Sequence, residues 1–123
     1  MPVAFALAAA LGAVARYLVD LAVTRRTASR GPAGILVVNV TGSLVLGVVV
    51  GLSLYHGVAD PTRAVVGSGF VGAYTTFSTF SYDTVRLLED GRLRQAALNI
   101  PLSLAGGLAA AATGLWLEAV AWP

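Results

Sequence analysis

Hydroxyl and phenyl side chains crowd one uncharged stretch, Gly67–Tyr82, which reads GSGFVGAYTTFSTFSY. Two phenylalanines lie three residues apart among several hydroxyl groups: Phe77 and Phe80, with Thr75, Thr76, Ser78, Thr79 and Ser81. Hydroxyl groups donate hydrogen bonds, and the edge of a phenyl ring carries positive potential. Paired phenylalanines are often plain core residues, but this density of donors favours a wall that attracts a small anion without a trapping cation.

Glycines precede this wall at Gly67, Gly69 and Gly72. Glycine and the β-branched threonines that follow it both disfavour a helix. An irregular backbone inside a membrane is tolerated only where protein buries it or where it lines a hydrated path, and its freed carbonyl groups can hold a cation. The sequence therefore predicts a candidate ion-binding break at Gly67–Thr76.

Other polar groups lie within strongly apolar segments and need a partner or a purpose. The amide of Asn39 either bonds a neighbouring helix or donates to a path. Arg16 either reaches the near interface or pairs with Asp20 one turn later, and both options give it a structural role. Asn99 and Ser103, four residues apart, share one helix face.

Four long apolar blocks must position these groups, at about residues 2–23, 35–55, 64–86 and 96–117. Each has roughly the 20 residues that a helix needs to cross a bilayer. Of the 123 residues, 57% are apolar and 11% are charged. The sequence predicts an all-α integral membrane protein with one domain, residues 1–123, of four transmembrane helices, the third broken. The first block is expected to be a retained span, because no basic residue precedes it and hydrophobic residues resume after Arg16; a cleaved signal peptide is the alternative.

Small residues and short loops predict how the spans pack. Gly47 and Gly51 in the second block, and Gly106, Ala110 and Gly114 in the fourth, are spaced four apart, which is typical of close helix contacts. The connections are short, so consecutive spans are expected to cross back and forth as neighbours.

The distribution of arginine predicts the orientation, because the chain has no lysine. The second loop and both termini carry only Arg63, whereas the first and third loops carry Arg25, Arg26, Arg30, Arg86, Arg92 and Arg94. Basic loops stay in the cytoplasm. Loops one and three are therefore predicted to be cytoplasmic, and both termini to lie outside.

Three motifs resemble those of the Fluc/CrcB fluoride channels. GAVARY (residues 12–17) is similar to that family's first-span G-A-x-x-R-Y, and VNVTGS (residues 38–43) to its second-span N-x-x-G-S. GFVGAYTTFSTFS (residues 69–81) resembles the third-span motif almost letter for letter. The resemblance extends over all four spans.

The resemblance implies a passive, fluoride-selective channel that lets fluoride leave the cytoplasm and lowers its toxicity. It implies a multi-pass protein of a prokaryotic plasma (inner) membrane that forms an antiparallel dimer, with fluoride paths along the subunit interface. Asn39 would donate to fluoride, and Phe77 and Phe80 would meet it edge-on. Ser103 of the fourth span is also expected in the pore. The backbone carbonyl groups of Gly72 and Thr75 would hold a structural sodium ion at the dimer interface. The remaining implied roles are a hydroxyl lining from Ser78, Thr79 and Ser81, and a structural role for Arg16.

Two departures from the family pattern carry consequences. Many members have tyrosine at the place of Asn99 and extend hydroxyl groups along the fourth span where this chain has Gly107 and Ala111, so one of two implied paths is altered. The arginine bias holds a chain in one orientation. The antiparallel partner is therefore expected to be either a second copy or, as the bias favours, a paralogous chain of opposite orientation.

Other function classes fit less well. A small dual-chain drug or cation carrier needs a carboxylate deep in a span, whereas Asp20 and Glu118 lie near span ends. A non-transporting membrane assembly protein would need only the small-residue faces and leaves the TTFSTF cluster unexplained. No cysteine and no histidine within a span could serve as nucleophile or base, so an enzyme is not expected.

Overall fold

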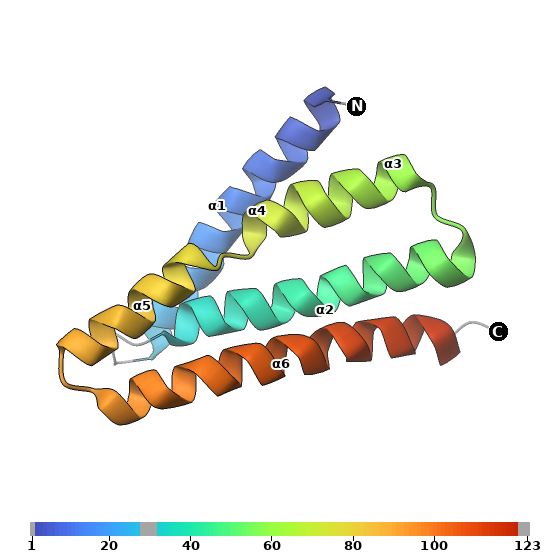
Figure 1. Ribbon diagram of the computed structural model, residues 1–123. Coiled ribbons are helices and arrows are strands. Elements are labelled where there is room, and N and C mark those ends of the chain that lie inside the picture. The colour runs from blue at the N-terminus through green and yellow to red at the C-terminus, as the bar shows by residue number, and fades with distance from the viewer. Residues whose placement is uncertain (1, 28–31, 121–123) are drawn as a thin grey trace.

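The structure, a computed structural model, describes residues 2–27 and 32–120 (Figure 1). Three long helices are α1 (Pro2–Arg26), α2 (Ala33–His56) and α6 (Leu93–Val120). A composite third pass joins α2 to α6 and consists of α3 (Asp60–Arg63), the π-helical segment η1 (Ala64–Val71), α4 (Gly72–Tyr74) and α5 (Ser78–Glu89). Arg30, one of the arginines of the first loop, lies outside the described residues.

The prediction of four helical passes with a broken third one is confirmed. α1, α2 and α6 are 25, 24 and 28 residues long and are apolar enough to cross a membrane. The third pass is interrupted because the backbone is extended at Thr75, with φ −82° and ψ 156°. Arg25 and Arg26 occupy the last turn of α1, where positive charge complements the helix dipole.

The break begins later than the glycines indicated, so the predicted boundary at Gly67 is wrong. The chain continues as π-helix through Gly67 and Gly69 and then as α-helix to Tyr74. Both glycines are buried, and a Cβ atom added to Gly69 would lie 3.3 Å from Cβ of Ala8 on α1. Gly69 therefore allows close packing against α1. Among the described residues of this pass, the helix is interrupted only at Thr75–Phe77.

α2 and α6 run side by side along most of their length, as Figure 1 shows. A Cβ atom on Gly47 would overlap the Ala111 carbonyl, and one on Gly114 would overlap the backbone of Leu44 and Val48. The predicted small-residue faces thus meet each other. At the far end of this pair, Nε2 of His56 lies 3.5 Å from a carboxylate oxygen of Glu118.

Replacing Gly114 with alanine is expected to lower the midpoint of thermal unfolding in detergent. The added methyl group has no room against α2, and overpacking of this kind costs about 1–3 kcal/mol. Gly107→Ala is the matched control on the same helix, because its Cβ atom would lie at an ordinary 3.4 Å from Oγ of Ser43. Equal midpoints for the two variants would contradict the close α2–α6 contact.

α1 crosses the third pass instead of running parallel to it (Figure 1). The crossing is tight at Gly12, where an added Cβ atom would overlap the Phe70 carbonyl. The Asp20 side chain, two turns further along α1, packs against Gly34 at the start of α2. α1 therefore packs closely against the π-helical segment that leads into the break and against the start of α2.

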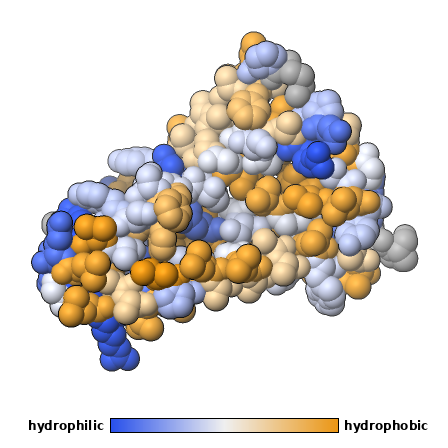
Figure 2. All heavy atoms as spheres, viewed as in Figure 1, coloured by the Kyte–Doolittle hydropathy of each residue, from blue (hydrophilic) through white to orange (hydrophobic). Residues whose placement is uncertain are grey.

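Much of the outer surface is apolar. Large exposed hydrophobic side chains include Val3, Leu104 and Leu108, and Leu108 is 74% exposed. Figure 2 shows hydrophilic residues at the left end, near the turn between α5 and α6, and in a second patch at the upper right, with much apolar surface between the two. A surface of this kind suits contact with lipid and with another membrane-embedded chain.

Candidate functional site

The side-chain amide of Asn39 forms two hydrogen bonds with the backbone at the break in the third pass. Its Nδ2 donates to the Thr76 carbonyl at 2.9 Å, and its Oδ1 accepts from the Thr76 N–H at 2.9 Å. The backbone N–H can only donate, so the orientation of the amide is unambiguous. Asn39 therefore replaces the helix as the hydrogen-bond partner of Thr76, and it keeps one further N–H for another acceptor.

Four backbone carbonyl groups, those of residues 72–75, lose their usual helical partners at the same place, and Gly72 and Thr75 are two of them. In an unbroken helix, the Thr76 N–H would donate to Gly72, but here it donates to Asn39. The Thr79 N–H would donate to Thr75, but here it donates to Oγ1 of Thr76 at 3.2 Å. The carbonyl groups of Gly72 and Thr75 are thus released, and Gly72 lies exposed on the surface of the chain.

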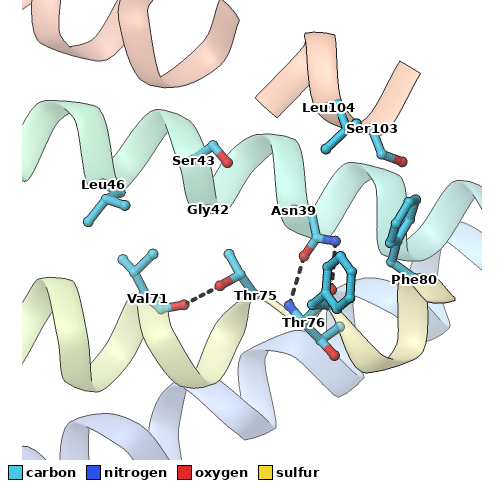
Figure 3. A pocket seen from close by; sticks show the side chains of 11 residues that line it. Asn39, Gly42, Ser43, Leu46, Val71, Thr75, Thr76, Phe80, Ser103 and Leu104 are labelled. Carbon is cyan, nitrogen blue, oxygen red and sulfur yellow. Dashed lines mark hydrogen bonds between the residues drawn. The ribbon is translucent and has the colours of Figure 1, made fainter. Parts of the chain in front are cut away.

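A cavity of about 240 Å³ opens between α2, α6 and the break (Figure 3). Its polar walls come from an amide and several hydroxyl groups, and its lining residues are all uncharged: Asn39, Gly42, Ser43, Leu46, Val71, Thr75, Thr76, Phe77, Phe80, Ser103 and Leu104. Figure 3 shows Asn39, Phe80 and Ser103 at one end of the cavity. The site offers neutral donors within an apolar enclosure.

Phe77 and Phe80 form the aromatic part of this wall. Their ring centroids are 5.6 Å apart and the ring planes are tilted by 50°. Phe77 directly precedes α5 and is 76% exposed, whereas Phe80 lies in the first turn of the helix and is partly buried. An aromatic ring exposed to this degree on an apolar chain is expected to be covered by lipid or by a partner.

The cavity brings together four of the residues predicted for the pore, Asn39, Phe77, Phe80 and Ser103, but not the other three. The Ser81 hydroxyl donates to the Phe77 carbonyl at 3.0 Å. The Ser78 hydroxyl lies 3.2 Å from that of Thr76. Their hydroxyl groups are thus engaged beside the break instead of lining this cavity.

Thr79, the third of these residues, lines a second and more polar cavity of about 430 Å³. Charged side chains of both signs surround it, among them Asp20, Asp83, Arg86 and Arg92. The Oγ1 atoms of Thr76 and Thr79 are 3.3 Å apart, and Thr76 lines the first cavity. A pair of hydroxyl groups thus links the neutral cavity to the charged one.

Ser43 and Thr76 line the cavity but were missing from the predicted pore residues. A signal was present for Ser43, because it lies one helical turn after Asn39 on the same face. Thr76 was recognised only as part of a hydroxyl-rich stretch. Its backbone contact with Asn39 joins residues 37 positions apart, and no local pattern predicts such a contact.

Arg16 lies apart from this cavity, and its side chain is partly buried. Among the described residues, the structure gives no ion pair between Arg16 and Asp20, one of the two options that the sequence left open. The Asp20 carboxylate instead accepts a hydrogen bond from Thr24 at 3.4 Å. The structural role expected for Arg16 remains a prediction.

The amino-acid sequence of this chain is similar to those of known proteins. Residues 3–115 match the family described as "CrcB-like protein, Camphor Resistance (CrcB)". The chain is 46% identical over 118 residues to "Fluoride-specific ion channel FluC 1" of Leifsonia xyli subsp. xyli, covering 96% of this chain and 86% of the relative.

Two further relatives carry similar names. "Fluoride-specific ion channel FluC 2" of Mycobacterium tuberculosis (strain ATCC 25618 / H37Rv) is 46% identical over 110 residues, covering 89% of this chain and 84% of the relative. "Fluoride-specific ion channel FluC" of Shewanella sp. (strain ANA-3) is 41% identical over 99 residues, covering 80% of each.

Proposed function

The chain belongs to the CrcB-like family, and we propose that it works as its named relatives do, as a fluoride-specific ion channel of the membrane. Fluoride would move passively and leave the cytoplasm down its gradient. The function is transport and not catalysis. Neither a drug carrier nor an assembly protein gains support from these relatives.

The uncharged cavity around Asn39 is the observation that carries this proposal. Removing a small anion from water into a low-dielectric interior has an idealised cost of about 20 kcal/mol, so donors must replace water along the path. Asn39 has one N–H that the Thr76 carbonyl does not use, and Phe80 lies beside it in the cavity. Neutral donors of this kind can bind fluoride and still release it.

In the proposed path, fluoride moves from the charged cavity to the neutral one. The arginine distribution predicts that the turn between α5 and α6 faces the cytoplasm, and the charged cavity near Arg86 and Arg92 lies at that end. Fluoride would enter through this cavity, pass the hydroxyl groups of Thr79 and Thr76, and reach Asn39 and Phe80. Hydrogen fluoride crosses membranes as a neutral weak acid and ionises inside, so a passive exit for the anion lowers its toxicity.

A structural sodium ion fits the released carbonyl groups of Gly72 and Thr75. Hard cations prefer oxygen ligands, and a break in a membrane helix supplies them without charge. Because Gly72 lies on the exposed surface, an ion there could be shared with the same carbonyl groups of a second chain. It would hold two breaks together at a dimer interface.

An antiparallel dimer would also cover the exposed Phe77 ring. The bias of six arginines against one holds this chain in a single orientation. The partner proposed here is therefore a paralogous chain with the opposite bias, since two copies inserted the same way cannot pair antiparallel.

Fluoride efflux from liposomes tests both the channel and its partner. The partner arm uses an inverted copy of this chain with the opposite bias, in which four arginines become glutamine and two residues of the second loop become arginine: Arg25, Arg26, Arg30 and Arg94, and Ala59 and Thr62. Two arginines then remain on loops one and three, against three on the second loop. The chain produced alone is expected to release little fluoride, and the chain co-produced with the inverted copy to release it fast. Fluoride and chloride are compared in every sample, with empty liposomes as the control.

The results distinguish a failure of the partner proposal from a failure of the channel proposal. Robust fluoride efflux from the chain produced alone would overturn the need for an opposite partner and leave the channel intact. Chloride efflux as fast as fluoride efflux, in any combination, would overturn the assignment as a fluoride-specific channel.

A further inference from the structure

A chain of hydrogen bonds joins the wall of the neutral cavity to the backbone of Phe80. Ser103 on α6 bonds Oδ1 of Asn99 at 3.3 Å, and Nδ2 of Asn99 bonds Oγ1 of Thr84 on α5 at 2.8 Å. Thr84 in turn bonds the Phe80 carbonyl at 2.9 Å. Asn99 is only 4% exposed and does not line the cavity. Its two ends nevertheless connect to two residues that do.

The direction of every bond in this chain follows from donor chemistry. The Phe80 carbonyl can only accept, so Thr84 spends its single proton there and can only accept from Asn99. The Asn99 atom that faces Thr84 must then be the NH₂ group, and its carbonyl oxygen faces Ser103. A carbonyl oxygen can only accept, so Ser103 donates its one proton to Asn99.

This direction matters for an anion in the cavity. Ser103 is partly exposed to the cavity, as Figure 3 shows from its position beside Phe80 and Asn39. With its proton held by Asn99, the Ser103 hydroxyl turns oxygen lone pairs towards the cavity, which repel fluoride. To donate to fluoride, Ser103 must give up its bond to Asn99, whose 3.3 Å length marks it as the weakest in the chain.

We propose that Asn99 is a positioning residue for fluoride binding: it holds the Ser103 proton away from the empty cavity and yields it when fluoride arrives. The inference rests on the proposed channel function. Asn99 does not contact the ion. Its hydrogen bond to Ser103 must break before Ser103 can donate to fluoride, so the free energy of that bond weakens fluoride binding. Asn99 thereby tunes binding at the α6 wall towards weak, reversible contact, as conduction requires.

Asn99→Leu tests this, because leucine has the same branched shape and leaves no buried donor without an acceptor. Leucine is bulkier than asparagine, and any packing cost at this buried site appears in the thermal midpoint. The freed Ser103 proton should lower the fluoride concentration that gives half-maximal efflux by roughly two- to tenfold, the effect of one net hydrogen bond. In a Ser103→Ala background the same substitution should change nothing. Efflux is measured in the assembly in which the wild-type chain conducts, and thermal midpoints are recorded in parallel.

Thr84→Val reaches the same end by another route and guards against misfolding of the first variant. Without its acceptor at Thr84, the Asn99 amide is free to turn its NH₂ group to Ser103, which releases the Ser103 proton. The half-maximal concentration should again fall. Thr113→Val is the matched control on α6, since the Thr113 hydroxyl bonds only its own helix at the Ala109 carbonyl, 2.7 Å away.

A shift that vanishes in the Ser103→Ala background supports the proposal. An equal shift in both backgrounds, or none in either Asn99→Leu or Thr84→Val, overturns it, because a purely structural role would not depend on Ser103. Absence of fluoride efflux from the wild type in every assembly would instead overturn the channel function itself.

Discussion

Replacing Phe80 with isoleucine is expected to lower fluoride efflux at least about tenfold, which corresponds to about 1.4 kcal/mol added to the barrier. Phe80 lines the neutral cavity with Asn39, and its ring lies 5.6 Å from that of Phe77. Isoleucine keeps an apolar side chain of considerable bulk but has no ring edge with positive potential. The loss would therefore measure the electrostatic contribution of the ring to fluoride transport.

The matched control is Phe70→Ile in the same pass. Phe70 stacks on Tyr74 with ring centroids 5.9 Å apart. It lines an apolar groove that adjoins the neutral cavity at Gly42 and Val71, but it does not line the neutral cavity itself. It should leave efflux within about twofold of the wild type once the amount of folded protein is matched, because exchanges of similar volume are tolerated best. Wild-type efflux from Phe80→Ile, or equal losses in the two variants, would remove Phe80 from the pathway.

Hydropathy and loop composition were enough to predict the four passes, because lipid requires each span to satisfy its own backbone. The break was predicted in the right pass, and Thr75 and Thr76 lie within the predicted range, but its start was placed too early, at Gly67. Glycine allows two outcomes, an interruption or a close approach, and Gly69 takes the second, against α1. Gly67 is buried, but an added Cβ atom there would meet only ordinary contacts at 3.6 Å or more. Which outcome a glycine takes depends on its neighbour on another helix, and the local sequence does not contain that information.

Only some of the residues that line the neutral cavity could be predicted from the sequence. Side-chain type identified Asn39 and the two phenylalanines, because an amide and clustered rings are rare in an apolar span. Hydroxyl groups could not be sorted in this way. Ser81 bonds the carbonyl four residues earlier, a local choice open to any serine in a helix, whereas Ser43 and Thr76 face the cavity.

The double contact between Asn39 and Thr76 is the part that no sequence pattern indicated, and it changes the role expected of Asn39. A side chain expected to be either a link between helices or a donor to the ion can be both. The Oδ1 atom and one N–H of the amide bond the Thr76 backbone, and the second N–H can still donate to an anion. Anion binding and the shape of the break thus depend on the same group.

Replacing Asn39 with alanine is therefore expected to abolish two properties at once, fluoride efflux and stabilisation by sodium. Efflux loses the amide donor, and the Thr76 backbone loses two hydrogen bonds, each costing about 1–3 kcal/mol when a buried group is left unpaired. The Thr76 N–H can regain a partner with the smallest rearrangement by donating to the Gly72 carbonyl, which would extend α4. That rearrangement removes a proposed sodium ligand, so efflux should fall by at least about a hundredfold.

The sodium response separates this variant from Phe80→Ile. Thermal midpoints are measured in sodium chloride and in N-methylglucamine chloride at equal ionic strength, and an ion that binds only the folded state raises the midpoint. The wild type and Phe80→Ile should both be stabilised by sodium, whereas Asn39→Ala should not. A full sodium response in Asn39→Ala would show that the released Gly72 carbonyl does not depend on Asn39. Phe80 and Gly72 share no hydrogen bond, so the aromatic wall and the cation site are expected to be independent. Loss of the sodium response in Phe80→Ile would contradict that independence.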